Sequence, residues 1–97
     1  MAKRDVPQRV LNDISSFARK NGVEKVVLFG SRARGDNAER SDVDIASSGG
    51  DFDSFYFDVK EKTHSLLMID VVNLNSKISD DLMNEIKKDG VVIYEKA

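Results

Sequence analysis

Two aspartates spaced two residues apart carry the first chemical signal in this sequence. Asp42 and Asp44 lie in residues 41–46, where they alternate with Val43 and Ile45 as in a β-strand. Residues i and i+2 of a strand point to the same side, so the two carboxylates face one way, about 6–7 Å apart at their bases. Like charges at that distance repel each other unless a cation lies between them. Because Mg²⁺ prefers oxygen ligands, the pair is a candidate half of a Mg²⁺ site, and an exposed strand face is the alternative.

A third aspartate, Asp70, lies inside the apolar run 66–72, which is predicted to be a strand. A buried carboxylate without a partner is costly, so its presence there needs an explanation. If this strand lies beside the one with Asp42 and Asp44, the three carboxylates form one cluster. Such a cluster holds two metal ions about 3.5–4 Å apart, the arrangement used for in-line attack on phosphorus. The alternative is a buried acid satisfied by backbone donors.

Gly30 and Ser31 follow the apolar run 26–29 and end it abruptly. Glycine lets the backbone approach a phosphate closely, and the serine hydroxyl with nearby N–H groups donates to phosphate oxygens. Arg32 and Arg34 add charge-assisted donors, with exposure to solvent as the alternative for each. The order Gly-Ser, ten residues, Asp-x-Asp is expected by chance about once in a hundred such chains. Residues 30, 31, 32 and 34 are therefore candidates for binding nucleotide phosphates.

The elements that must position these residues follow from the apolar periodicity. Spacings near 3.6 predict helices, and alternating or continuous apolar residues predict strands. The predicted helices cover residues 7–20, 52–62 and 79–88, with a short turn at 31–34, and the predicted strands cover residues 23–29, 41–46, 66–72 and 91–94. This alternation predicts an α+β fold, with an open sheet of three or four strands packed against helices in a single domain, residues 1–97.

Composition excludes several classes of protein. The chain has 97 residues, no cysteine and a formal net charge of −2. The lack of cysteine excludes disulfide scaffolds, zinc–thiolate sites and thiol nucleophiles. No apolar run approaches the roughly 18 residues of a membrane span and no signal peptide follows Met1, so we expect a cytoplasmic protein without a membrane partner.

The charges are divided unevenly along the chain. Residues 1–40 carry nine Lys and Arg against five Asp and Glu, whereas residues 41–97 carry six against twelve. This division suits a site that handles an anion and a divalent cation together, although chance clustering of solvated side chains gives the same pattern. The net acidic charge argues against broad nucleic-acid binding, which depends on Lys and Arg contacts.

Several segments resemble the minimal nucleotidyltransferases of the DNA polymerase β superfamily. They are LFGSRARG at 28–35, SDVDI at 41–45, IDVV at 69–72 and IKKDGVVIY at 86–94. The resemblance covers nearly the whole chain and implies the nucleotidyltransferase fold with a small mixed sheet. One departure, ASSGG at 46–50 where relatives are apolar, predicts a short second strand.

The resemblance also implies roles for the candidate residues. Gly30 and Ser31 would hold the triphosphate of an NTP, with ATP the expected substrate. Asp42 and Asp44 would bind the metal, two Mg²⁺ ions being expected. Asp70 would bind metal as well and activate the attacking hydroxyl.

The resemblance implies a partner too, because small members of this group, the MntA-like antitoxins, pair with a HEPN-type toxin ribonuclease. The implied reaction moves AMP from ATP to a tyrosine of the toxin. Two alternatives stay open. A non-catalytic antitoxin would neutralise its partner by binding, and Phe57 is a candidate contact because it falls outside the predicted stripe of Phe52, Phe55, Tyr56 and Val59. A small-molecule nucleotidyltransferase would need a second subunit to complete its acceptor pocket.

Overall fold

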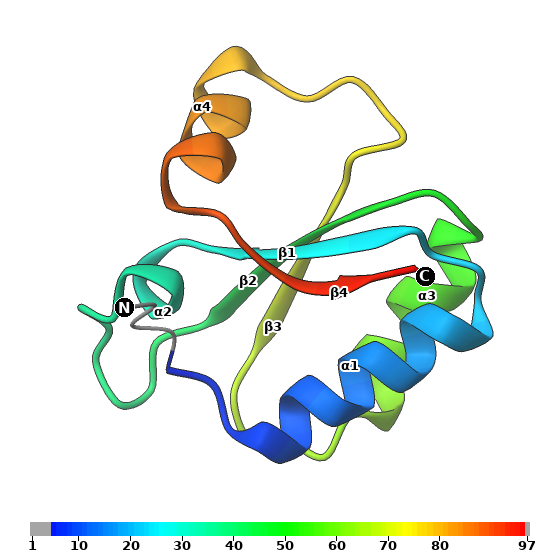
Figure 1. The fold of residues 1–97 in the computed structure, drawn as a ribbon. Helices are drawn as coiled ribbons and strands as arrows, with labels where there is room; N and C mark the ends of the chain where they lie inside the picture. The colour runs from blue at the N-terminus through cyan, green and yellow to red at the C-terminus, as the bar shows by residue number, and fades with distance from the viewer. Residues whose placement is uncertain (1–4, 97) are drawn as a thin grey trace.

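The computed structural model describes residues 5–96 of the chain. Helices and strands alternate along it (Figure 1). The helices are α1 (Gln8–Lys20), α2 (Ser31–Arg34), α3 (Phe52–Lys62) and α4 (Asp80–Asp89), and the strands are β1 (Lys25–Phe29), β2 (Val43–Ser48), β3 (Ile69–Asn73) and β4 (Val91–Glu95). No helix in this part of the chain is long and apolar enough to cross a membrane.

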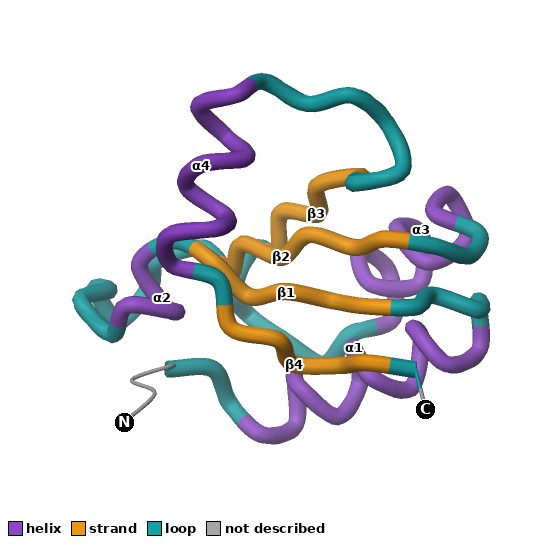
Figure 2. Tube along the Cα trace, turned by 45° about the horizontal axis from the view of Figure 1, so that its top comes forward, coloured by secondary structure: helices purple, strands orange, loops and turns teal. Residues whose placement is uncertain are grey.

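The strands form a four-stranded mixed sheet in the order β3-β2-β1-β4 (Figure 2). β1 runs antiparallel to both β2 and β4, whereas β2 and β3 run parallel. The predicted α+β fold is therefore confirmed. β3 and β4 are the two edge strands, which leaves β2 paired on both sides.

The larger core lies between the sheet and the pair α1 and α3, which cover the same face (Figure 1). Val10, Ile14 and Ala18 are buried at four-residue intervals along α1, as the apolar periodicity predicts. They pack with Phe55 and Val59 of α3. The strands contribute Val26, Leu28, Val43, Ile45 and Ile69 to this core.

The opposite face of the sheet is covered by α4, and only in part (Figure 1). Ile86 of α4 packs against Phe29 and Ala46 in a second, smaller core. Asp44 lies two residues before Ala46 and therefore shares its face. Because the packing is centred on Ala46, the Asp44 side chain stays partly accessible.

Three local predictions differ from the structure. β3 begins at Ile69 rather than at residue 66, because the preceding residues form a loop in which Leu66 is fully exposed. β2 extends to Ser48 and is not shortened by the polar run 46–50, since both neighbouring strands pair with it there. Tyr56, predicted in the buried stripe of α3, is 41% exposed.

A polar contact joins the two helices of the larger core. Asn21 Nδ2 donates to Asp58 Oδ2 at 2.9 Å, and Lys62 and Lys20 bring their ammonium groups to 3.2 and 3.4 Å of the same carboxylate. The hydrogen bond from Asn21 is the largest cause that lowers the pKa of Asp58, and the two lysines add to it. Asp58 is buried, so the ionised carboxylate depends on these partners.

We expect Asp58→Asn to lower the melting temperature at pH 7 by several degrees. A carboxyl with a lowered folded-state pKa stabilises the fold above its unfolded pKa, about 3.9, and loses this effect as the pH falls through the folded value. The difference between the variant and the wild type should therefore shrink as the pH falls below 4. Thermal unfolding followed by circular dichroism measures it, with Glu61→Gln on the same helix as control. A difference that stays constant down to pH 2 would contradict the assignment.

Candidate active site

The parallel pairing of β2 and β3 brings two of the predicted aspartates together. Asp44 and Asp70 are direct partners in the register. Asp42 precedes the first residue of β2 and is exposed, as Asp70 is, whereas Asp44 is half-buried. The three aspartates thus lie in one row on the face of the sheet that α4 leaves partly open.

Electrostatics show that these carboxylates share one environment. Burial is the largest cause that raises the pKa of Asp44 to about 6, and the charges of Asp70, Asp42 and Glu85 raise it further. Arg34 acts in the opposite direction. The site therefore carries an excess of negative charge around a half-buried acid, which a cation would relieve.

The donors of this row fit a hard divalent cation. All are carboxylate oxygens, the ligands that Mg²⁺ takes while retaining several of its waters. Within residues 5–96, no three acidic or histidine side chains already converge on one point as a closed metal cage. A divalent ion at this row would therefore be held by an open set of carboxylates and would retain several of its waters.

Gly30 joins the predicted phosphate turn to the carboxylates. It lies between β1 and α2 with φ 77°, a left-handed conformation that side chains disfavour. A Cβ atom there would lie 2.5 Å from Asp44 Oδ2, closer than any real contact. Only glycine lets the chain turn directly against Asp44. Ser31, half-buried, follows as the first residue of α2.

Arg32 has a different place from the one predicted for it. Its side chain is buried, and its guanidinium donates to three backbone carbonyls, those of Asp5 at 2.6 Å and of Glu39 and Ser41 at 2.8 Å each. The group is thus directed at the loop that leads into Asp42 rather than at the open face. Arg32 holds this loop in place.

Arg34 lies at the candidate site, but its guanidinium forms ion pairs with two aspartates. It contacts Asp36 at 3.0 Å and Asp89, at the end of α4, at 2.8 Å. It thereby links α2 to α4 while lying close enough to lower the pKa of Asp44. Sequence reasoning missed Glu85 and Asp89, because nothing in their spacing marks them. Their relevance arises only when α4 folds over the sheet.

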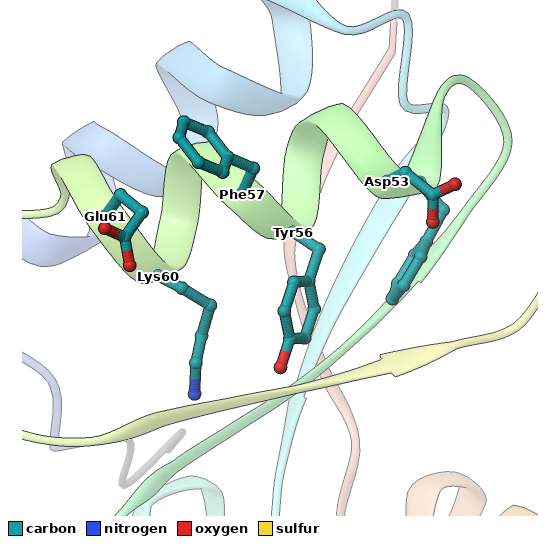
Figure 3. A pocket seen from close by; sticks show the side chains of 6 residues that line it. Asp53, Tyr56, Phe57, Lys60 and Glu61 are labelled. Carbon is teal, nitrogen blue, oxygen red and sulfur yellow. The ribbon is translucent and has the colours of Figure 1, made fainter.

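A second concave surface lies along α3 and contains none of the predicted site residues (Figure 3). Tyr56 and Lys60 extend from α3 towards β3, whereas Phe57 points away from it. Lys60 Nζ donates to the carbonyl of Ile69 at 2.8 Å. Phe57 is 57% exposed, which confirms that it lies outside the core.

A strand–glycine–serine–helix turn set against carboxylates on two neighbouring parallel strands defines a nucleotidyltransferase-type site. The sequence comparison agrees, because residues 12–97 match the family described as Polymerase beta, Nucleotidyltransferase. The chain belongs to this family and is a nucleotidyltransferase. No curated protein matches the chain.

Three of the solved structures similar to this one are described as toxin–antitoxin structures. A toxin–antitoxin structure with AMP-PNP is 26% identical, with a TM-score of 0.70, covering 89% of this chain and 73% of that one. Two mutant structures of the toxin–antitoxin MntA-HpeT are each 24% identical. Their TM-scores are 0.70 and 0.69, and they cover 89% and 95% of this chain and 73% and 75% of theirs. At that identity, the two mutant structures support the fold alone.

Removal of the Asp44 charge tests whether the three carboxylates repel one another and bind a metal ion. We expect metal-free Asp44→Asn to be more stable than the wild type at pH 8. A raised folded-state pKa means that the folded protein binds more protons than the unfolded chain, so the carboxyl destabilises the fold increasingly as the pH rises from 4 through about 6. The difference should vanish below pH 4. Mg²⁺ should raise the melting temperature of the wild type and have a much smaller effect on the variant.

Glu61→Gln, on the far helix α3, serves as the control and should keep the full response to Mg²⁺. An Asp44→Asn variant that gains as many degrees with Mg²⁺ as the wild type would contradict a metal site here.

The role of Arg32 is tested separately. We expect Arg32→Gln to destabilise the fold by about 1–3 kcal/mol, because the buried guanidinium is the donor to three backbone carbonyls and a glutamine cannot replace all three hydrogen bonds. Arg34→Gln should cost clearly less than Arg32→Gln, because exposed ion pairs contribute little to stability. Urea unfolding of both variants measures the difference. Equal small losses would mean that Arg32 does not hold the loop.

Proposed function

We propose that this nucleotidyltransferase moves AMP from ATP to a hydroxyl of a partner protein, a tyrosine of a HEPN-type toxin, and thereby acts as its antitoxin. The observation that carries the proposal is the register of Asp44 with Asp70 beside the Gly30 turn. The similarity to the toxin–antitoxin structure with AMP-PNP supports a toxin partner and an adenine nucleotide.

The carboxylate row is where the metal would be held. Asp42, Asp44 and Asp70 would bind Mg²⁺, two ions being expected, which when bound neutralise the triphosphate and polarise the α-phosphate. The backbone N–H groups of the Gly30–Ser31 turn and the Ser31 hydroxyl would donate to the phosphate oxygens. Arg34 would place positive charge near them, and Arg32 acts indirectly by holding the loop before Asp42.

The transfer itself is a single displacement. The acceptor oxygen bonds to the α-phosphorus as the bond to the bridging oxygen of the β-phosphate breaks, and pyrophosphate leaves. Asp70 is exposed at its position opposite Asp44, so it is available to take the proton of the acceptor hydroxyl.

Neutralisation by binding alone is the second candidate. The exposed Phe57 and the concave surface along α3 favour it, since exposed aromatic groups are typical of contact surfaces. In that case the aspartates would not be needed for the antitoxin effect.

Labelled nucleotide distinguishes these functions. With Mg²⁺ and the purified product of the adjacent gene, ATP labelled at the α-phosphate should transfer label to that protein, and ATP labelled at the γ-phosphate should not. Asp70→Asn should slow the transfer about 100-fold or more, the typical effect of losing a general base. Glu95→Gln, an exposed acid on β4 at the other edge of the sheet, is the matched control and should keep full activity.

Mass spectrometry should locate the added AMP on a tyrosine. Transfer at the wild-type rate by Asp70→Asn would contradict the mechanism. A triple variant with asparagine at positions 42, 44 and 70 that still neutralises the toxin at equal stoichiometry would favour binding alone.

A further inference from the structure

A hollow of about 430 Å³ opens directly beside the carboxylate row. Asp42 forms part of its wall, so the hollow and the candidate active site are continuous. The residues that line it are Glu39, Arg40, Asp42, Leu66, Leu67 and Met68.

Two large apolar side chains stand exposed at this hollow. Leu66 is fully exposed and Met68 is 61% exposed. Large apolar groups gathered on a surface next to a site are typical of contacts with another molecule. The backbone of this segment is held in place, because the carbonyl of Met68 accepts a hydrogen bond from Val43 N at 2.8 Å, and the Ser65 hydroxyl bonds to the backbone of Leu67. The segment therefore stays next to Asp42.

The geometry of the displacement at phosphorus indicates which substrate would contact this surface. In an in-line displacement, the acceptor oxygen and the leaving group lie on opposite sides of the phosphorus. The Gly30–Ser31 turn follows β1, whereas the hollow borders β2 and the edge strand β3. A triphosphate held at the turn therefore directs its leaving pyrophosphate towards β1 and receives the acceptor from the side of β3. No strand pairs with β3 on that side within residues 5–96, so the approach is open.

The charges at the rim suit a protein segment. Arg40 is exposed and has no carboxylate within 4 Å among the described residues, so its guanidinium is available to a partner. Glu39 and Asp42 also line the hollow, and Asp42 belongs to the candidate metal position, which leaves Arg40 and Glu39 as the charges offered to a partner. An apolar surface beside this cation and this anion fits a protein segment that carries an apolar side chain and charged residues, with an acidic one opposite Arg40.

We propose that Leu66, Met68 and Arg40 form the acceptor-docking surface of this nucleotidyltransferase. It takes the segment of the partner protein that flanks the acceptor hydroxyl, with an apolar side chain against Leu66 and Met68 and an acidic residue against Arg40. This inference rests on the proposed function, because it assigns the place where that acceptor binds.

The test is the double variant Leu66→Ser/Met68→Ser, assayed with the purified product of the adjacent gene. The KM for that protein should rise at least about tenfold, with kcat at saturation nearly unchanged. The dissociation constant for AMP-PNP with Mg²⁺ should not change. Val92→Ser is the matched control, because Val92 is 46% exposed on β4, at the opposite edge of the sheet. It should leave both quantities unchanged.

Other outcomes would overturn the assignment. Weaker binding of AMP-PNP by the double variant would mean that the hollow takes the nucleotide, and an unchanged KM would mean that the acceptor docks elsewhere. If the double variant fails to fold, Leu66→Ser alone replaces it, since the Leu66 side chain is fully exposed. Arg40→Glu should raise the KM as well.

Failure of the proposed function gives a different result. If the wild type transfers no label, calorimetric titration with the same protein still tests the surface, and the double variant should bind at least about tenfold more weakly than the wild type. Equal binding by both, or no binding by the wild type, would overturn the docking surface.

Discussion

The parallel pairing of β2 with β3 sets Asp44 opposite Asp70, and the rest of the site depends on this one register. A shift of a single residue would turn one carboxylate to the opposite face of the sheet. The pairing also forces like charges together, as the raised pKa of Asp44 shows. The repulsion is tolerated because the same strands are anchored from behind. Val43, Ile45 and Ile69 are buried against α1 and α3.

The two faces of the sheet therefore have different functions. One face buries most of the apolar side chains and supplies stability, whereas the other is covered by α4 around Ile86 and leaves the carboxylates partly open. Gly30 brings the candidate phosphate-binding turn to the carboxylates, because its missing side chain lets the turn after β1 lie against Asp44. Arg32 then holds the following loop through backbone carbonyls, which fixes the approach to Asp42. The site is thus built on strands and a fixed turn rather than on long loops.

The sequence was sufficient to predict the α+β fold and the strands that carry Asp44 and Asp70, because local periodicity and alternation report directly on elements. Asp42, predicted inside the strand 41–46, lies just before β2. The sequence also predicted the abrupt turn at Gly30 and Ser31, because these residues follow an apolar run. The function of Arg32 could not be predicted, since an arginine beside a phosphate motif looks the same in the sequence whether its side chain faces a ligand or the backbone carbonyls of a loop. Leu66 and Met68 look like strand residues in the sequence. Their exposure depends on where pairing with β2 begins, which is a tertiary property.

The basic N-terminal half of the chain places less free positive charge at the candidate active site than its composition suggests. The guanidinium of Arg32 donates to backbone carbonyls, and Arg34 is already paired with Asp36 and Asp89. Little free positive charge from these two residues therefore faces the open side of the sheet, while the row around Asp44 is strongly negative. A triphosphate approaching this row meets repulsion unless cations arrive with it. Affinity for nucleotide should accordingly depend more on the metal than on either arginine, which is the reverse of what the basic N-terminal half of the sequence suggests.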